Sequence, residues 1–299
     1  FERVLAFKGQ LERVFDTAQT GFSYWYETTR RYLTINITPL NVSAKFALMM
    51  KESGAGFVFT SATLSVDNEL THFNASLGLK PKQSMMVDSP FDYENQALLC
   101  LPRYLPETHA DNMPHAIVKL TLELIKSAKG RCFVLFTSYR MMHLVAEGLT
   151  TQMDYPVYMQ GQMSKRIILE KFTRHGNAVL LGTASFWEGV DVRGSTLSCV
   201  IIDKLPFAAP DDPLLQARMQ DCQMQGKDPF AHIQLPQAVI ALKQGVGRLI
   251  RDNKDKGVLV ICDNRLVTRQ YGQVFLKSLP PMRRTRSLED ANTFLKHIN

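Results

Sequence analysis

The sequence lacks the features that mark membrane-bound and secreted proteins. Across its 299 residues, no apolar run approaches the roughly 18 residues that a membrane-spanning helix needs. The first residues, Phe1 to Gln10, carry charge and do not have the layout of a secretory signal peptide. We therefore expect a cytoplasmic protein that has no membrane partner.

Cysteine and histidine are too sparse and too scattered to predict a metal site. The five cysteines include no CxxC pair, and the two nearest, Cys199 and Cys222, are 23 positions apart. Cys132, Cys199 and Cys262 lie in or beside apolar runs, where cysteines are usually reduced and belong to the core. None of the seven histidines completes a ligand or triad spacing. The sequence predicts no metal ion and no iron–sulfur cluster within this stretch.

Acidic residues are fewer than basic ones. The chain has 35 Lys and Arg against 28 Asp and Glu, a formal net charge of +7. This balance favours a polyanionic partner such as nucleic acid, but only mildly, because many basic proteins bind none.

The first fifty residues carry both helix and strand patterns. Apolar residues from Val4 to Phe15 recur at about the helical period, with charges between them, and predict a helix. Alternation over 22–26 and 32–37 predicts two strands. Residues 42–50 predict a further helix, which ends near Gly54.

Short all-apolar runs follow, and each predicts a strand that is buried on both faces. They occupy residues 56–59, 132–136, 178–181, 199–202 and 258–262. Helical patterns lie between the later runs, over residues 114–128, 140–149, 164–174, 213–225 and 236–251. Such alternation predicts an α/β fold with a doubly wound parallel sheet from about residue 95 onward.

Functional loops in such sheets leave the carboxyl ends of the strands. The residues that follow the apolar runs there include Thr60, Ser61 and Thr63, then Ser138 and Tyr139, then Thr183, and then Lys204. Small hydroxyl residues and exposed backbone amides suit phosphate oxygens. Several such loops on one edge therefore suggest a phosphate-bearing ligand.

The sharpest pattern is Gln244-Gly-Val-Gly-Arg248-Leu-Ile-Arg251. On a helix, Gln244, Gly247, Arg248 and Arg251 share one face, which offers one carboxamide and two guanidinium groups. Two arginines aimed at one point can neutralise charge on a transferring phosphoryl group. The alternative is a solvated helix in which Arg251 pairs with Asp255.

An ordered series of motifs strengthens the functional interpretation. It comprises Phe59-Thr-Ser-Ala-Thr-Leu64, Ser89-Pro-Phe-Asp-Tyr93, Leu135-Phe-Thr-Ser-Tyr139, Ser185-Phe-Trp-Glu-Gly-Val-Asp191, Ile202-Asp-Lys-Leu-Pro-Phe207, Gln244 to Arg251 and Asp263-Asn-Arg265. The series spans about residues 33 to 266 and resembles the DinG/XPD-like branch of superfamily 2 DNA helicases, in particular its bacterial YoaA-type members. The resemblance implies two RecA-like motor domains with ATP bound between them.

The resemblance also implies roles for individual residues. Thr60, Ser61 and Thr63 match a segment that couples the ATP state to DNA, and Ser138 with Tyr139 matches a contact with the DNA backbone. Thr183 and Lys204 are further expected DNA contacts. Glu188, Gly189 and Asp191 match a loop that joins the DNA and nucleotide sites, and Gly247 is expected beside the nucleotide. Gln244, Arg248 and Arg251 match the helix that offers arginine fingers to the γ-phosphate.

The same family uses motifs that this sequence lacks. The one Gly-Lys step, Gly226-Lys227, is followed by Asp228 and does not end a phosphate loop. The Asp-Glu-x-His motif for Mg²⁺ and water is absent, and so are the four cysteines of the family's iron–sulfur cluster. All three normally lie upstream of the matched blocks. We therefore expect the C-terminal part of a longer helicase, in which an N-terminal half binds most of the ATP and Mg²⁺ and could carry the cluster.

These expectations define a domain plan. Residues 1–32 would be the tail of an arch insertion, 33–65 the end of the first RecA-like motor domain, and 66–299 the second motor domain. The expected partners are single-stranded DNA, the N-terminal motor domain of the same chain and replication or repair proteins. The expected location is the bacterial cytoplasm, near the nucleoid.

Two alternatives stay open from the sequence alone. One is a non-catalytic DNA- or partner-binding module with a motor-like fold, and the other is an unrelated α/β enzyme that acts on a small phosphorylated substrate. Two smaller features are also ambiguous. Trp187 suits either a packed loop or base stacking. Arg283, Arg284 and Arg286 suit either a solvated basic tail or contacts with phosphates.

Overall fold

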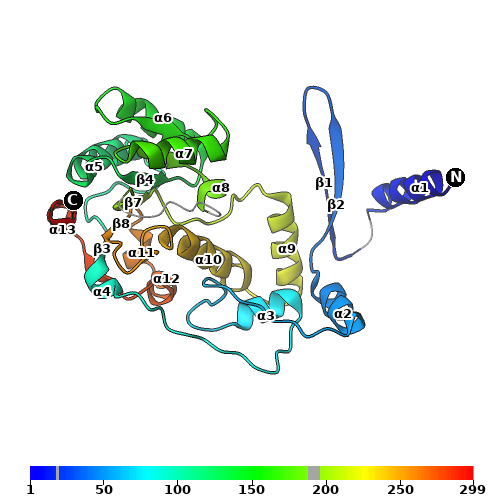
Figure 1. Ribbon diagram of the computed structural model, residues 1–299. Helices are drawn as coiled ribbons and strands as arrows, with labels where there is room; N and C mark the ends of the chain where they lie inside the picture. Colours follow the sequence, from blue (N-terminus) through cyan, green and yellow to red (C-terminus); the bar gives the residue numbers. More distant parts are fainter. Residues whose placement is uncertain (18–19, 188–195, 299) are drawn as a thin grey trace. The chain divides into compact units, whose positions relative to one another are not determined.

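The computed structural model describes residues 1–17, 20–187 and 196–298 (Figure 1). The chain divides into two compact units. The first comprises Phe1–Ser65, Glu69–Ser84 and Phe207–Gln237, and the second comprises Val66–Asn68, Met85–Pro206 and Ala238–Asn299. Among the described residues, no helix is long and apolar enough to cross a membrane.

The second unit is built on a parallel sheet with the strand order β5-β6-β4-β7-β8-β3-β9. Its strands are β3 (Ala97–Cys100), β4 (Cys132–Leu135), β5 (Val157–Met159), β6 (Val179–Gly182), β7 (Cys199–Ile202), β8 (Gly257–Ile261) and β9 (Arg283–Thr285). Its helices are α4 (Tyr93–Gln96), α5 (Met113–Ala128), α6 (Tyr139–Thr150), α7 (Lys165–His175), α8 (Ala184–Trp187), most of α10 (Leu235–Val246), α11 (Arg265–Thr268), α12 (Gly272–Ser278) and α13 (Leu288–Ile298).

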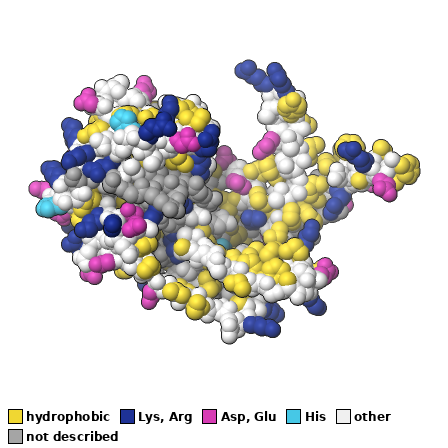
Figure 2. All heavy atoms as spheres, in the orientation of Figure 1, with side chains coloured by type: hydrophobic (Ala, Val, Ile, Leu, Met, Phe, Trp, Pro, Cys, Tyr) yellow, Lys and Arg dark blue, Asp and Glu magenta, His cyan; other side chains and the backbone are white. Residues whose placement is uncertain are grey.

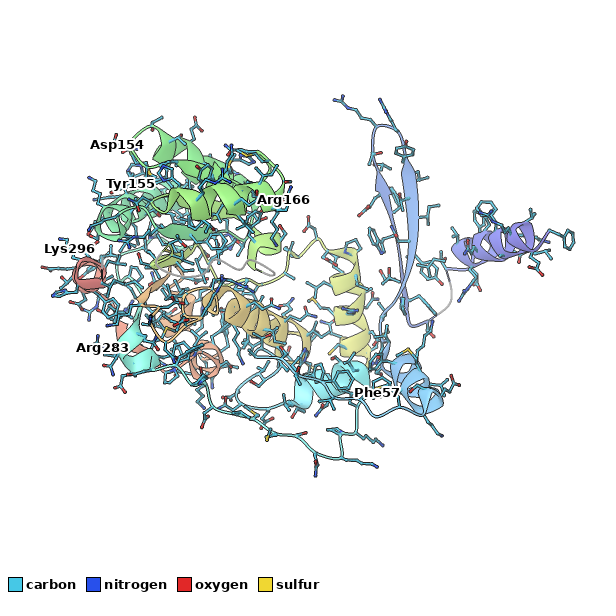
Figure 3. All side chains as sticks on the ribbon, in the orientation of Figure 1. Phe57, Asp154, Tyr155, Arg166, Arg283 and Lys296 are labelled. Atoms are coloured by element: carbon cyan, nitrogen blue, oxygen red, sulfur yellow. The ribbon has the colours of Figure 1, made fainter. Side chains whose placement is uncertain are left out.

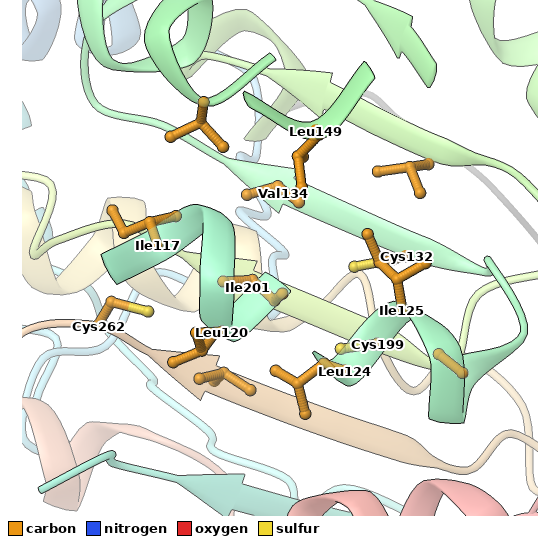
Figure 4. Packing of buried hydrophobic residues seen from close by; sticks show 14 of the residues in the cluster. Ile117, Leu120, Leu124, Ile125, Cys132, Val134, Leu149, Cys199, Ile201 and Cys262 are labelled. Carbon is orange, nitrogen blue, oxygen red and sulfur yellow. The ribbon is translucent and has the colours of Figure 1, made fainter. Parts of the chain in front are cut away.

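The core lies on both faces of this sheet because its central strands are buried throughout. On one face, α5 packs Ile117, Leu124 and Ile125 against Val134 of β4 and Ile201 of β7 (Figure 4). Side chains that alternate with these point to the other face, as a strand requires. There Phe133 meets Phe186 of α8, with their ring centroids 6.4 Å apart. The prediction of a doubly wound parallel sheet is confirmed.

The first unit contains a β-hairpin and several helices. Its elements are α1 (Glu2–Phe15), β1 (Phe22–Thr28), β2 (Leu33–Pro39), α2 (Ser43–Ser53), α3 (Thr71–Leu77), α9 (Pro213–Met224) and the π-helix η1 (Phe230–Gln234). The antiparallel hairpin pairs Phe22 with Pro39, and α9 holds its base because Arg218 Nε donates to the carbonyl of Leu40 at 3.1 Å. The two strands and both helices expected in the first fifty residues are confirmed.

Two predicted elements are wrong. Residues 56–59 form no strand, and Val58 is 88% exposed, because no described strand pairs with this apolar run. The helix expected over 236–251 ends at Val246, after which i→i−3 hydrogen bonds from Arg248 and Leu249 tighten the chain into a turn. Gly247, Arg248 and Arg251 therefore do not lie on one helical face with Gln244.

The C-terminal arginines are not a solvated tail. Arg283 to Thr285 form the edge strand β9, which pairs with β3. Figure 3 labels Arg283. Its guanidinium group lies 5.8 Å from the ring centroid of Phe294, and Arg284 donates to the carbonyl of Leu276. The sequence pattern missed this strand because an exposed edge strand needs no apolar residues.

Residues 207–237 group with the N-terminal segments rather than with the sheet. The division into an arch tail and two motor domains describes the family's architecture and stays a prediction for this chain.

Tight packing where β8 begins makes Gly257 sensitive to substitution. A Cβ atom at this position would lie 2.6 Å from the carbonyl oxygen of Ser198 and 2.5 Å from Cδ1 of Leu249. We expect Gly257→Ala to lower the free energy of unfolding of the sheet by about 1–3 kcal/mol, the usual effect of overpacking. Urea denaturation followed by circular dichroism measures this. Gly56→Ala is the matched control, because this position lies outside the helices and strands and a Cβ there meets nothing within 4 Å. Equal stability of the two variants would contradict the packing argument.

Candidate functional site

The carboxyl ends of β6, β4 and β7 bring three of the predicted residues to one edge of the sheet. Thr183 follows β6, Ser138 lies just beyond β4, and Lys204 lies just beyond β7. These strands are direct neighbours, so the loops that follow them are adjacent. Hydroxyl groups, backbone amides and an ammonium group gather there, which is a set that suits phosphate oxygens.

Asp203, directly after β7, ties two of these loops together. Its carboxylate is 1% exposed and accepts hydrogen bonds from the backbone N–H of Thr137 at 3.0 Å and of Lys204 at 2.7 Å. The hydroxyl of Thr137 donates to its other oxygen at 3.2 Å. Burial raises the pKa of Asp203 to about 7, although these donors and the charge of Lys204 act in the opposite direction.

Asp263 lies two residues beyond the end of the neighbouring strand β8. Its Oδ2 accepts a hydrogen bond from the backbone N–H of Leu205 at 2.9 Å. The guanidinium group of Arg265 donates to both carboxylate oxygens, with the shortest distance 2.7 Å, and this pairing raises the pKa of Arg265. Two successive residues of one loop, Lys204 and Leu205, are thus fixed by carboxylates on two strands.

Gln160 connects the loops on the other side of β4. Its side-chain oxygen accepts from the backbone N–H of Thr183 at 2.7 Å and from its hydroxyl at 3.0 Å. Its side-chain nitrogen donates to the hydroxyl oxygens of Tyr139 at 2.6 Å and of Ser185 at 3.1 Å. Gln160 therefore fixes the positions of two residues that the sequence nominated for DNA binding.

Ser138 acts as the N-cap of α6, where its hydroxyl oxygen accepts from the backbone N–H of Met141 at 3.3 Å. The amino end of this helix thus lies at the same edge as Lys204. Because the amino end of a helix carries partial positive charge, it favours an anion. Tyr139, next along the helix, is exposed.

The arginines of the Gln244 motif lie at the opposite edge. Leu249 contacts the position where β8 begins, and the side chain of Gln96, just before β3, donates to the carbonyls of Asp252 and Asp255. Residues 248–256 therefore lie at the amino ends of the strands. Arg248 Nε donates to the carbonyl of Gln244 at 3.1 Å, and Asp255 Oδ2 accepts from the backbone N–H of Arg251 at 2.9 Å.

The structure does not bring the remaining predicted site residues together with Ser138, Thr183 and Lys204. Glu188, Gly189 and Asp191 lie outside the described residues. Thr60, Ser61 and Thr63 belong to the first unit, where the backbone N–H of Thr63 donates to the hydroxyl of Ser61 at 3.2 Å. Gly247 is exposed in the turn after α10.

Sequence reasoning missed Asp203, Asp263 and Gln160 as site residues. An aspartate directly after a fully apolar strand was a usable signal for the first two, because a charge there is buried or nearly so. Gln160 gave no signal, since its partners lie more than twenty positions away.

The described residues do not form a metal site. Within the part of the chain that the structure covers, no group of three or more His, Cys, Asp or Glu side chains could hold a metal ion. All five cysteines are buried, and burial raises the pKa of Cys100 to about 12. The donor set of the described residues does not fit an iron–sulfur cluster.

Over the residues that the structure describes, the seven-stranded parallel sheet with helices between its strands defines a doubly wound α/β domain. The model of the helicase C-terminal domain family matches residues 121–282, and the chain belongs to this family. It is 53% identical to the ATP-dependent DNA helicase YoaA of Escherichia coli over 99% of this chain and 46% of that protein. It is 35% identical to the ATP-dependent helicase DinG of Mycobacterium tuberculosis over 91% of this chain and 41% of that protein.

Solved structures agree with the fold. An XPD helicase structure is superimposable with a TM-score of 0.64 at 19% identity, over 93% of this chain and 50% of that one. The resemblance to the DinG/XPD-like helicases and the RecA-like fold class are therefore both confirmed. The chain spans about half the length of the curated relatives that it matches.

The raised pKa of Asp203 predicts a specific pH dependence of stability. Its native pKa of about 7 lies above its unfolded value, so its protonated form stabilises the fold at low pH. That contribution is lost as the pH rises from about 4 to about 7. Against Asp203→Asn, wild-type stability should fall by up to about 1.4 kcal/mol per pH unit in this window. The asparagine variant keeps an oxygen for both backbone donors, and its amide can donate to Thr137. Parallel stability profiles of the two proteins in urea would refute the assignment.

Proposed function

We propose that this chain is the C-terminal part of an ATP-dependent DNA helicase, which couples ATP hydrolysis to movement along single-stranded DNA in the 5′-to-3′ direction. Its membership of the helicase C-terminal domain family supports this proposal, and so do relatives that are named ATP-dependent DNA helicases. As in the superfamily 2 enzymes that its motifs resemble, the motor would comprise two RecA-like domains.

The observation that carries the DNA half of the proposal is the hydrogen-bonded edge around β4. Ser138, Tyr139, Thr183 and Lys204 come from three loops, and Asp203 and Gln160 hold those loops in register. DNA-backbone contacts need donors at fixed spacing rather than base-specific groups. The hydroxyl groups of Ser138 and Tyr139 accept hydrogen bonds within the protein and can each still donate one, and the ammonium group of Lys204 adds a charged donor.

The arginine motif supports the ATP half of the proposal. Gln244, Arg248 and Arg251 would face the γ-phosphate of an ATP that the N-terminal motor domain binds with Mg²⁺. Glu188, Gly189 and Asp191 would join the DNA and nucleotide sites. When bound, Mg²⁺ supplies charge neutralisation, and the arginines add charge where the transition state develops it.

The biological setting belongs to the same proposal. We place the full protein in the bacterial cytoplasm at the nucleoid, with replication or repair proteins as partners and a role in DNA repair. An iron–sulfur cluster, if the protein uses one, would lie in the N-terminal half.

DNA-stimulated ATPase activity tests the proposal. The full-length protein should hydrolyse ATP faster when single-stranded DNA is added, whereas residues 1–299 alone should show no stimulated turnover, because phosphate-binding groups are missing from them. Phosphate release measured with and without DNA distinguishes the two. A full-length protein that binds DNA but never hydrolyses ATP would favour the non-catalytic binding module. Turnover by the isolated chain that Arg248→Ala abolishes would contradict the proposed division of labour.

The arginine fingers make a separate kinetic prediction. Arg248→Ala or Arg251→Ala in the full-length enzyme should lower kcat by roughly 10²- to 10⁴-fold, because a finger acts in the transition state. KM for ATP should change far less. Lys at either position should not restore activity, since it lacks the forked guanidinium geometry. Lys254→Ala, an exposed charge in the same loop, is the matched control. Normal turnover by Arg248→Ala would disprove the role but leave the fold assignment intact.

A further inference from the structure

The loop after β3 presents an aromatic side chain that the core does not use. Tyr104 is 95% exposed, and Arg103 beside it is also exposed. Both lie in a turn that starts three residues after the end of β3. A single exposed aromatic residue on a mobile loop would need no explanation. An aromatic residue on an ordered turn is more informative, because the fold then holds it in an exposed position.

Hydrogen bonds fix the turn at both of its ends. Before it, the backbone N–H of Leu101 donates to the carbonyl of Thr285 at 2.9 Å, and Arg286 Nε donates to the carbonyl of Leu101 at 3.3 Å. After it, the side chain of Asn264 donates to the carbonyl of Leu105 at 3.2 Å. The hydrogen-bond partners of the turn thus come from β9 and the residue after it, and from the loop after β8.

The sequence of the loop stiffens it further. Pro102 and Pro106 flank the turn, and proline restricts the backbone. Pro102 is buried, and Leu105 packs against the core. Arg103 and Tyr104 are therefore displayed by a loop whose backbone is already ordered. Binding through them requires little ordering of the protein, and this favours affinity.

The loops around Tyr104 carry three arginines, of which Arg265 is paired with the carboxylate of Asp263. The strand order β8-β3-β9 makes the loops after these strands neighbours at the carboxyl edge. Each loop carries an arginine there, namely Arg265 after β8, Arg103 after β3 and Arg286 after β9. Arg265 is held in place by Asp263, and Arg286 by the carbonyl of Leu101.

The position of this turn connects it with the proposed DNA edge. From β6 to β3 the sheet order runs β6-β4-β7-β8-β3, which is four strand spacings. At about 4.8 Å each, the row of loops from Thr183 to Tyr104 extends about 19 Å. A ligand long enough to follow this row is a strand of nucleic acid rather than a nucleotide.

We propose that Tyr104 stacks on a base of single-stranded DNA, with Arg103 and Arg286 against the adjoining phosphates, at the end of the track that begins at Thr183. This inference rests on the proposed function and adds a binding site to it. Stacking on tyrosine tolerates any base, and so it suits a motor that moves along DNA irrespective of sequence.

Binding of fluorescent oligonucleotides by the full-length protein tests the stacking contact. For an oligothymidylate, Tyr104→Ala should weaken binding by about 5- to 150-fold, whereas Tyr104→Phe should keep the affinity. The loss should disappear with an oligonucleotide whose sugar–phosphate backbone carries no bases. Because the ring is exposed, unfolding temperatures should stay equal. In the DNA-stimulated ATPase assay, Tyr104→Ala should raise the DNA concentration for half-maximal activity.

Arg103→Ala tests the phosphate contact. It should weaken binding to both oligonucleotides alike and lower the slope of log affinity against log salt by about 0.7. Arg174→Ala, which removes an exposed charge at the amino edge before β6, is the matched control and should change neither.

The outcomes separate this inference from the function on which it rests. If wild type binds DNA and hydrolyses ATP but Tyr104→Ala binds as tightly, the stacking site is refuted and the helicase proposal stands. The exposed turn would then be a contact for another protein. If wild type does not bind single-stranded DNA at all, both proposals fail.

Discussion

The loops of the candidate DNA edge depend on one buried carboxylate. Asp203 accepts hydrogen bonds from the backbone on each side of it, at Thr137 and at Lys204, so two loops of different strands cannot move independently. A buried carboxylate is destabilising unless its oxygens are satisfied. The three donors that surround it offset part of that effect, and the pKa of about 7 shows that burial still dominates. Asp263 repeats the arrangement on the next strand with a guanidinium partner, which completes its pairing.

The same geometry separates two kinds of chemistry. Parallel strands put all their carboxyl ends at one edge, where Thr183, Ser138 and Lys204 collect, and all their amino ends at the other. The chain between β7 and β8 includes α10, whose C-terminal turn delivers Arg248 to the amino edge. The contacts proposed for DNA and for the nucleotide therefore lie at opposite edges of one sheet. Basic side chains are spread over the visible surface rather than gathered in one patch, so charge alone would not locate either contact (Figure 2).

The sequence predicted features that consecutive residues define, and it missed contacts between residues far apart along the chain. Strands β4, β6, β7 and β8 are apolar throughout. Because both faces of each strand are buried, every consecutive residue must be apolar, and the sequence shows this directly. The run over residues 56–59 has the same pattern but no described strand beside it, which shows that a strand also needs neighbours. At the site, Thr183 and Ser138 could be nominated from their positions after strands. The partners that orient them could not, because Gln160 reaches Thr183 across 23 positions.

The position of Asp203 beside Lys204 has a consequence for charge at this edge. If DNA lies along the edge as proposed, a phosphate beside Lys204 adds negative charge near Asp203 and offsets the ammonium group that lowers its pKa. The bound state then favours the protonated carboxyl group, and protonation favours binding by the same factor. The carboxyl group need not release either backbone N–H when it is protonated, since its Oδ1 accepts both. The loops thus keep their spacing while the charge beneath them changes.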